Sequence, residues 1–320
     1  MKTHIIASSK NPLGGAIEIV RQTFTAVTSK PVKRISFVAG LHGDELEGVY
    51  LCHQIIATLR QLKASRPQAF KGEIHVYPAV NPEALGSLTR LWPFFKMDMN
   101  RKMGDKNDDS LPAKFARSLI ADLQATSDLV VDFHASNLHL QELPQIRIIE
   151  EFAKKLLPLA ELCNMDVIWV HPFAPVFEST LGYNLNRKKI PALVVETGIC
   201  LRIHKEYCEQ VVNGMIHLLR KTGILEMDDP LPEIKQPLLV QPKQVALIQA
   251  SHAGLFISDT PIGAHVQKGD SLGKIVDPVR GEVLETVSFP ADGLLFTLRQ
   301  QPVTARGAPI ARIALKEARQ

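Results

Sequence analysis

The stretch SFVAGLHGDELEGVY, residues 36–50, joins an apolar run to a helical pattern through a turn that carries a histidine and a glutamate. The run Ile35–Ala39 has the composition of a buried strand and stops at a glycine. His42 and Glu45 follow three residues apart, and Gly43 between them gives the backbone freedom to bend sharply. An imidazole and a carboxylate are therefore expected at the carboxyl end of a strand.

Apolar runs alternate with helical patterns through the first two-thirds of the chain. The predicted strands are Ile35–Ala39, Ile74–Val80, Leu129–Phe133, Val167–Val170 and Leu193–Glu196. The predicted helices are Gly48–Leu62, Pro112–Gln124 with Ser110 as its cap, Glu150–Leu162 and Lys205–Lys221. Val- and Ile-rich strands that alternate with helices predict an α/β domain with a largely parallel sheet.

Polar side chains gather where these strands end, which is where ligands bind in such sheets. A zinc hydrolase needs three protein ligands of the His or carboxylate type and an open position for water. His42 and Glu45 can supply two ligands from one turn, and His134 in DLVVDFHAS is the candidate for the third. Asp132 precedes it by two residues on the same side of the strand and can hold its other ring nitrogen.

Glu196 in PALVVETG is the candidate general base. A carboxylate at the end of a buried strand is costly unless it has a partner, and partial desolvation raises its pKa toward neutrality. Each of these side chains alone is more often structural, because HxxE is common and a lone glutamate can cap a helix or form a salt bridge. Their joint placement at one edge of the sheet favours a site.

A second polar cluster lies in NPEALGSLTRLWPFFKMDMNR, residues 81–101, and contains Arg90, Asp98, Asn100 and Arg101. Arginine suits bidentate recognition of carboxylates. Spacing alone slightly favours a solvated, salt-bridged loop. The chain has no GxGxxG, Walker or GxSxG motif, so nucleotide chemistry and serine hydrolysis lack their usual support.

Composition excludes several classes of protein. Of the 320 residues, 45% are hydrophobic and 22% charged, and the net charge of +4 comes without a dense basic block, which argues against nucleic acid. The four cysteines form no CxxC pair. The N-terminal residues lack a signal-peptide apolar region, and no run approaches the roughly 20 apolar residues of a membrane span. A cytoplasmic protein that does not associate with membranes is expected.

The composition of the sequence changes around residues 227–243, where prolines cluster. The tail beyond residue 244 has short strand patterns, glycine turns and a weak repeat between VQKGDSLGKI, 266–275, and VTARGAPIARI, 303–313. We therefore predict domains at 1–235 and 236–320. The tail resembles the biotinyl/lipoyl carrier fold, but the expected hairpin tip carries Val279 and Arg280 in place of a lysine, which predicts an unmodified module.

Five motifs carry a resemblance to a known family. AGLHGDE at 39–45, NPEA at 81–84, DMNR at 98–101, DFHAS at 132–136 and VVETG at 194–198 occur in the order typical of the succinylglutamate desuccinylase/aspartoacylase family, relatives of the zinc carboxypeptidases. The resemblance implies an α/β fold: a zinc-carboxypeptidase-like mixed, largely parallel sheet flanked by helices. A small C-terminal all-β barrel-sandwich domain of the carrier type is a familiar companion.

The resemblance also implies roles for the residues of the site. His42, Glu45 and His134 would bind one Zn²⁺ per chain. Glu196 would act as general base and later as proton donor, and Arg90 would polarise the scissile carbonyl.

Four further residues would bind substrate in this family. Asn100 and Arg101 would hold its carboxylate, and Tyr183 and Arg187 in LGYNLNRKK would line the pocket. The segment LWPFFKM at 91–97 is bulky and aromatic, which is expected to reshape the pocket mouth toward larger or more apolar groups.

The predicted function is zinc-dependent hydrolysis of the amide bond of an N-acyl amino acid or a similar small carboxylate-bearing amide. The alternative is a metallocarboxypeptidase acting on short peptides, because the chemistry is shared. The C-terminal β domain favours the first, since in this family it can narrow the channel. A binding module without activity is disfavoured by the complete ligand and base set. The expected partner is a small-molecule substrate, and the sequence leaves the oligomeric state, including a homo-oligomer, open.

Overall fold

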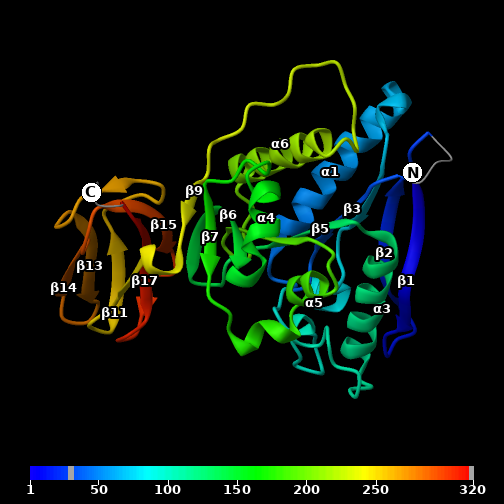
Figure 1. The fold of residues 1–320 in the computed structure, drawn as a ribbon. Coiled ribbons are helices and arrows are strands. Elements are labelled where there is room, and N and C mark those ends of the chain that lie inside the picture. The colour runs from blue at the N-terminus through cyan, green and yellow to red at the C-terminus, as the bar shows by residue number, and fades with distance from the viewer. Residues whose placement is uncertain (28–31, 317–320) are drawn as a thin grey trace.

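Four parallel strands form the centre of the fold. The computed structural model describes residues 1–27 and 32–316 (Figure 1). Within it, β4 (Glu73–Tyr77), β3 (Arg34–Ala39), β5 (Leu129–His134) and β8 (Ala192–Gly198) lie side by side in that order, and each neighbouring pair is parallel. These strands are covered on both faces, which explains their nearly continuous apolar sequence. Their carboxyl ends meet at one edge of the sheet.

Further strands extend this sheet on both sides and make it mixed. On the β4 side lie β2 (Ala16–Phe24) and β1 (Lys2–Lys10), both antiparallel. On the β8 side lie the antiparallel β6 (Leu140–Ile149), then the parallel β7 (Val167–His171) and β9 (Leu238–Val240). The sequence does not predict β1, β2 or β6. The first alternates exposed and half-buried residues, and Pro144 interrupts the pattern of the last.

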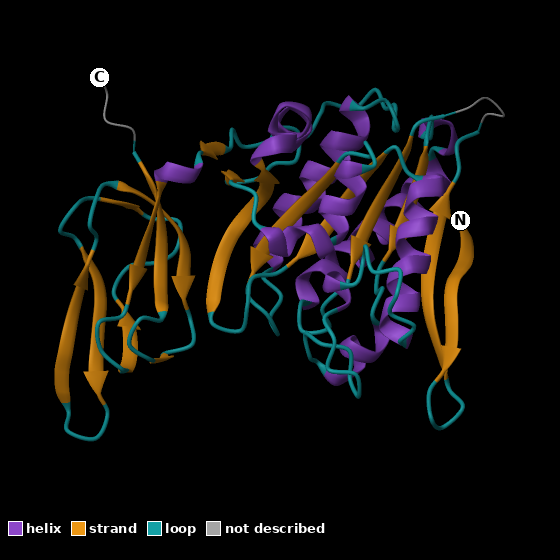
Figure 2. Cartoon of the chain, turned by 60° about the horizontal axis from the view of Figure 1, so that its bottom comes forward, coloured by secondary structure: helices purple, strands orange, loops and turns teal. Residues whose placement is uncertain are grey.

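Helices cover both faces of the sheet (Figures 1 and 2). The helices α1 (Leu46–Ser65) and α6 (Lys205–Lys221) pack together on one face, and α3 (Leu111–Thr126) and α5 (Leu181–Arg187) lie on the other. The short helices are α2 (Pro82–Ser87), α4 (Ala153–Ala160) and the 3₁₀ turns Pro67–Ala69, Met99–Arg101, Glu150–Phe152, Pro175–Ser179 and Pro242–Gln244. No helix in the described parts of the chain is long and apolar enough to cross a membrane.

Two helix predictions need correction. The predicted helix Glu150–Leu162 is a 3₁₀ turn followed by the two-turn α4, which contains Pro158. Ser110 occupies the N-cap position of α3, but its hydroxyl contacts the sulfur of Met97 at 3.5 Å and does not bond the first turn of the helix.

The C-terminal part is a β-sandwich of two four-stranded antiparallel sheets with the same strand order. One sheet runs β14-β13-β11-β16 and the other β10-β17-β15-β12. The two-residue strand β12 therefore pairs with β15, and the two-residue strand β16 pairs with β11. This arrangement explains the repeat, because both of its copies are a two-residue strand, a glycine turn and a long strand. The strands are β10 (Val245–Gln249), β11 (Gly254–Ser258), β12 (His265–Val266), β13 (Ser271–Asp277), β14 (Glu282–Ser288), β15 (Gly293–Arg299), β16 (Val303–Thr304) and β17 (Pro309–Leu315).

The sandwich is joined to the N-terminal sheet by hydrogen bonding between strands. Thr297–Arg299 of β15 pair antiparallel with Leu140–Glu142 of β6, which makes one continuous 13-stranded sheet. The proline-rich segment 227–243 contains β9, which pairs with β7 in the same sheet. The domain boundary at 235/236 stays a prediction. The turn between β13 and β14 exposes Val279 and Arg280, and the absence of a modification there also stays a prediction.

Candidate metal centre and substrate pocket

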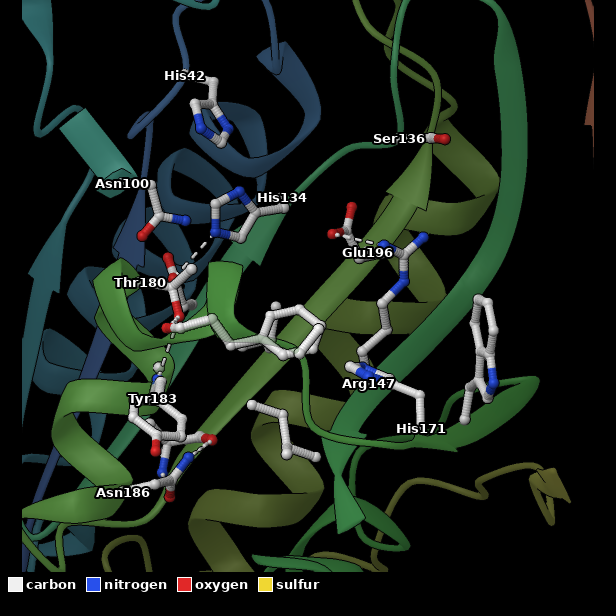
Figure 3. A pocket seen from close by; sticks show the side chains of 18 of the residues that line it. His42, Asn100, His134, Ser136, Arg147, His171, Thr180, Tyr183, Asn186 and Glu196 are labelled. Atoms are coloured by element: carbon white, nitrogen blue, oxygen red, sulfur yellow. Dashed lines mark hydrogen bonds and ion pairs between the residues drawn. The ribbon is translucent and has the colours of Figure 1, made fainter. Parts of the chain in front are cut away.

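A cavity of about 560 Å³ opens at the carboxyl ends of β5 and β8. Eight of the nine site residues predicted from the sequence line it, and Arg187 does not. The eight are His42, Glu45, Arg90, Asn100, Arg101, His134, Tyr183 and Glu196. Residues from distant parts of the sequence therefore meet in one pocket, as Figure 3 shows for five of them.

Three donor groups converge at the top of this pocket. The Nδ1 atom of His42 lies 2.6 Å from Oε1 of Glu45, and Nδ1 of His134 lies 2.8 Å from Oε2 of the same carboxylate. One ligand atom from each residue lies within 4.8 Å of the other two, and all three side chains are buried. Two imidazoles and a carboxylate are the donor set of a catalytic zinc site.

The remaining ring nitrogens are held by carboxylates. Nε2 of His134 lies 3.0 Å from Asp132, which is the contact predicted from the sequence. Nε2 of His42 lies 3.0 Å from Asp98, a role that the sequence does not reveal because Asp98 is 56 residues away. Such partners hold the protonated Nε2 and leave Nδ1 of each ring as the donor that faces the common point. The residues present therefore fit a metal ion.

The two neighbouring imidazoles favour the carboxylate form of Glu45. Burial alone would raise its pKa, but the imidazoles of His42 and His134 hold that pKa at about 2. A metal ligand must be deprotonated, so this lowered pKa is consistent with a ligand role for Glu45.

The turn between His42 and Glu45 is fixed by the NPEA motif, and this corrects the expected reason for Gly43. Gly43 does not have a positive φ; the bend lies at Gly40, where φ is +73°. A Cβ on Gly43 would come within 1.9 Å of the backbone of Ala84, so only glycine fits there. The side chain of Asn81 completes the clamp, because it donates to the carbonyl of Leu41 and accepts from the N–H of Ala84.

Glu196 lies on β8 directly beside His134 in the sheet register. Burial raises the pKa of Glu196 to about 7, although Arg147 opposes this rise with a guanidinium 3.4 Å from Oε1. Figure 3 shows the two side chains facing each other in the pocket. A carboxyl group with this pKa can both accept and return a proton near neutral pH.

The comparisons with known proteins agree with this geometry. The sequence model of the succinylglutamate desuccinylase/aspartoacylase catalytic domain matches residues 31–222, the segment that holds every site residue named so far in this subsection. The chain belongs to this family. The family that the five motifs suggested is therefore confirmed. Residues from these motifs meet at one site.

Similar proteins cover nearly the whole chain. The N-alpha-acetyl-L-2,4-diaminobutyric acid deacetylase of Halomonas elongata is 24% identical over 286 residues, which are 86% of this chain and 80% of that protein. The crystal structure of a succinylglutamate desuccinylase/aspartoacylase from Rhodobacter sphaeroides matches with a TM-score of 0.80 and 22% identity, over 100% of this chain and 96% of the other. The product-bound ectoine utilization protein EutE (DoeB) from Ruegeria pomeroyi matches with a TM-score of 0.78 and 18% identity, over 97% and 93%. These likenesses confirm the predicted fold class, including the C-terminal β domain.

Three pocket residues were missed by the family motifs. Arg147 donates to both oxygens of Glu142 at 2.7 Å, and Arg312 from β17 reaches the same carboxylate at 3.4 Å. Both guanidiniums lie over the ring of Trp169, at 5.5 and 5.7 Å from its centroid. Glu142 and Arg147 belong to the unpredicted β6, and Arg312 belongs to the second copy of the repeat. The β domain therefore contributes a side chain to the pocket of the family's catalytic domain.

The predicted substrate-binding residues near the metal centre differ in how many of their polar groups already have a partner. Arg90 contacts Glu45 at 3.3 Å and Asp98 at 3.1 Å, and its side chain remains 40% exposed. Asn100 accepts a hydrogen bond from the N–H of Leu181 at 2.8 Å, which leaves its amide nitrogen without a partner among the described residues. Arg101 lines the same wall and donates to the backbone of Asn100.

Tyr183 lines the cavity as predicted, but Arg187 and the segment 91–97 do not line it. Tyr183 is buried against the pocket, whereas Arg187 lies over the Tyr183 ring at 5.9 Å and outside the cavity lining. No residue of 91–97 lines the cavity: Trp92 is buried against Phe115, and the Phe94 side chain is 83% exposed. The expectation that this segment shapes the pocket is therefore wrong, and apolar lining comes from elsewhere.

Proposed function

We propose that this family member is a zinc-dependent deacylase that hydrolyses the amide bond of an N-acyl amino acid or a similar small, carboxylate-bearing amide. One observation carries the proposal. His42, Glu45 and His134 turn their donor atoms toward one point in a cavity that also contains Glu196. The relatives whose names record a deacetylase and a desuccinylase support the same class of reaction.

Zinc is the ion that this donor set favours, because borderline imidazole and carboxylate ligands suit it. When bound, it would polarise the substrate carbonyl and lower the pKa of a water molecule. Asp98 and Asp132 hold the two imidazoles in the orientation that such an ion needs.

Glu196 moves the proton. In its ionised form the carboxylate accepts a proton from the attacking water, and the resulting carboxyl group delivers it to the nitrogen of the leaving amine. A pKa of about 7 makes both steps accessible at neutral pH. Arg147 holds the carboxylate from the side, at 3.4 Å.

The arginines orient the substrate. Arg90 reaches the ligand Glu45 and can donate to the carbonyl oxygen as negative charge develops on it. Arg101 and the amide nitrogen of Asn100 also line the cavity and can hold the substrate carboxylate.

The β domain supports a small substrate over a peptide. Arg312 from β17 lines the cavity, and β15 is hydrogen bonded to β6 at its rim. A side chain of this domain in the cavity lining leaves less room for a polypeptide than for a small amide. Metallocarboxypeptidase activity remains the competing outcome.

The test is amine release by the zinc-loaded enzyme from a panel of N-acetyl and N-succinyl amino acids and short peptides, with Glu196→Gln as the blank. Turnover of acyl amino acids that the variant lacks supports the proposal. Turnover of peptides alone identifies a carboxypeptidase, and no turnover of either class overturns the proposal.

A further inference from the structure

The cavity continues well beyond the metal centre, along β8. Ala192, Val194 and Glu196 alternate onto the same face of the strand, and all three line the cavity. The four steps from Ala192 to Glu196 span about 13 Å of extended strand. The pocket therefore reaches from the proposed base far along the strand, toward its amino end.

Apolar and aromatic side chains form the walls of this extension. We call it the β8 channel and define it by its lining residues: Ile149, Phe152, Leu156, Phe173, Tyr183, Asn186, Ala192 and Val194. Its walls meet through aromatic contacts, because the ring of Tyr183 lies 5.7 Å from the rings of both Phe152 and Phe173. In Figure 3, Tyr183 and Asn186 lie at the end of the view opposite His42.

The channel offers no charge to a ligand. Both groups of the Asn186 amide are used, because each is hydrogen bonded to the backbone of Ala192 at 3.0 Å. Burial lowers the pKa of the neighbouring His171 to about 4, so its ring is neutral at pH 7. Arg147 is engaged by Glu142 and Glu196. The phenol of Tyr183 adds one neutral hydrogen-bonding group.

The positions of the proton donor and the carboxylate-binding groups decide which part of the substrate enters. The leaving amine must lie beside Glu196, where the channel begins. Asn100 and Arg101 lie at the start of α5, since Asn100 is hydrogen bonded to Leu181. An amino acid whose carboxylate is held there and whose nitrogen meets Glu196 directs its side chain along α5 and β8.

We propose that the substrate is an N-acyl derivative of an amino acid with a large, uncharged apolar or aromatic side chain, and that this side chain occupies the β8 channel. The inference rests on the proposed function and narrows it. A side-chain carboxylate or ammonium group would be buried there without a partner, which is strongly unfavourable. The substrate class therefore differs from that named for the Halomonas relative, whose diaminobutyrate carries a basic side chain.

The first test compares kcat/KM for N-acetyl-L-phenylalanine and N-acetyl-L-leucine with N-acetyl-L-aspartate, N-acetyl-L-2,4-diaminobutyrate and N-octanoylglycine. The apolar amino acid derivatives are expected to be favoured by a factor on the order of ten to a hundred. A preference for the charged derivatives overturns the inference while the proposed function stands. A preference for N-octanoylglycine assigns the channel to the acyl group and also overturns it.

If no amide is cleaved, a binding measurement still separates the channel assignment from the proposed function. That outcome refutes the proposed function, and calorimetry of zinc-loaded Glu196→Gln with N-acetyl-L-phenylalanine and N-acetyl-L-aspartate then tests the channel. Tighter binding of the aromatic ligand supports the channel assignment. Equal or weaker binding overturns it.

Variants of the channel provide the second test. Val194→Phe fills the channel next to Glu196 and is expected to lower the ratio of kcat/KM for N-acetyl-L-phenylalanine to that for N-acetyl-L-alanine by at least about tenfold. Val279→Phe makes the same change at a hairpin tip whose side chain is 91% exposed and should leave the ratio unaltered. Phe152→Arg adds a cation to the wall and should shift the preference toward N-acetyl-L-aspartate. Unchanged ratios in both channel variants contradict the inference.

Discussion

The guanidinium of Arg147 forms an ion pair with the carboxylate of Glu196 at 3.4 Å and is held in place by two hydrogen bonds to the buried Glu142. Two effects on the proposed base are thereby balanced. Burial favours the neutral acid, and the adjacent cation favours the carboxylate. The balance leaves the pKa of Glu196 at about 7, where one group can serve both halves of a hydrolysis.

Glu196→Gln should lower kcat by about 10²–10⁴, because the amide cannot accept a proton from water or return one to the amine. Zinc content should not change, since Glu196 is not among the converging donors. Steady-state kinetics and metal analysis of the purified variant provide the measurement. Near-normal turnover would remove Glu196 from the mechanism.

The kcat/KM of the enzyme should rise as the pH rises through about 7, because the base acts in its ionised form and its pKa lies there. Replacing Arg147 by Gln removes the cation that favours the carboxylate, so the midpoint should move to higher pH. Arg147→Lys keeps the charge and should shift it less. A pH–rate profile of the three proteins measures this, and a flat profile across neutrality would refute it.

Asp98→Asn and Asp132→Asn should each weaken zinc binding by about 10–100-fold, because each removes the carboxylate that holds a ligand imidazole. The measurement is competition against a chelator of known affinity, followed by recovery of activity on adding Zn²⁺. Asp109→Asn, at an 89% exposed side chain, is the matched control and should bind zinc normally. Equal affinities in all three variants would mean that these contacts do not support the metal.

Arg312→Ala should reduce kcat/KM and lower the free energy of unfolding by about 1–3 kcal/mol, because Glu142 loses one of its two cations in a buried position. Arg306→Ala changes an exposed arginine of the same domain and should alter neither quantity. Kinetics and denaturant unfolding compare the two. Identical behaviour would show that the β domain does not influence the pocket through this residue.

Gly43→Ala should destabilise the protein by at least about 2–3 kcal/mol and reduce zinc binding, because the new methyl group collides with the backbone of Ala84 beside the ligand turn. Gly86→Ala lies in the neighbouring α2, where an added Cβ meets nothing within 4 Å, and should be neutral or slightly stabilising. Thermal unfolding with and without Zn²⁺ measures both. A Gly43→Ala protein with normal stability would contradict the clamp.

The sequence predicts the central strands well and identifies three side chains that converge in the structure, because both inferences depend on short, local patterns. Ile35–Ala39 and Leu129–Phe133 are buried on both faces, so their apolar runs are continuous and end where the candidate ligands begin. Asp132 could be placed beside His134 because strand alternation puts residues two apart on the same side.

The rest of the site depends on contacts between distant segments, which no local pattern records. Asp98 meets His42 across 56 residues, and Arg312 meets Glu142 across 170. The aromatic segment at 91–97 is predicted to shape the pocket, yet the aromatic side chains that line the cavity come from the turns Glu150–Phe152 and Pro175–Ser179, from β7 and the residues just after it, and from α5. The structural role of Gly43 could not be predicted for the same reason, since the backbone that its Cα approaches belongs to Ala84 in α2.

The shared sheet has a consequence for attempts to separate the two domains. On the edge of β6 that faces away from β8, the backbone of Leu140–Glu142 is hydrogen bonded to β15. The remainder of the same edge pairs with β7. A chain cut after residue 235 would leave this edge open and deprive Glu142 of Arg312. Open strand edges recruit other strands, so the isolated N-terminal part is expected to self-associate. The C-terminal sandwich is thus expected to prevent aggregation of the domain whose pocket it borders.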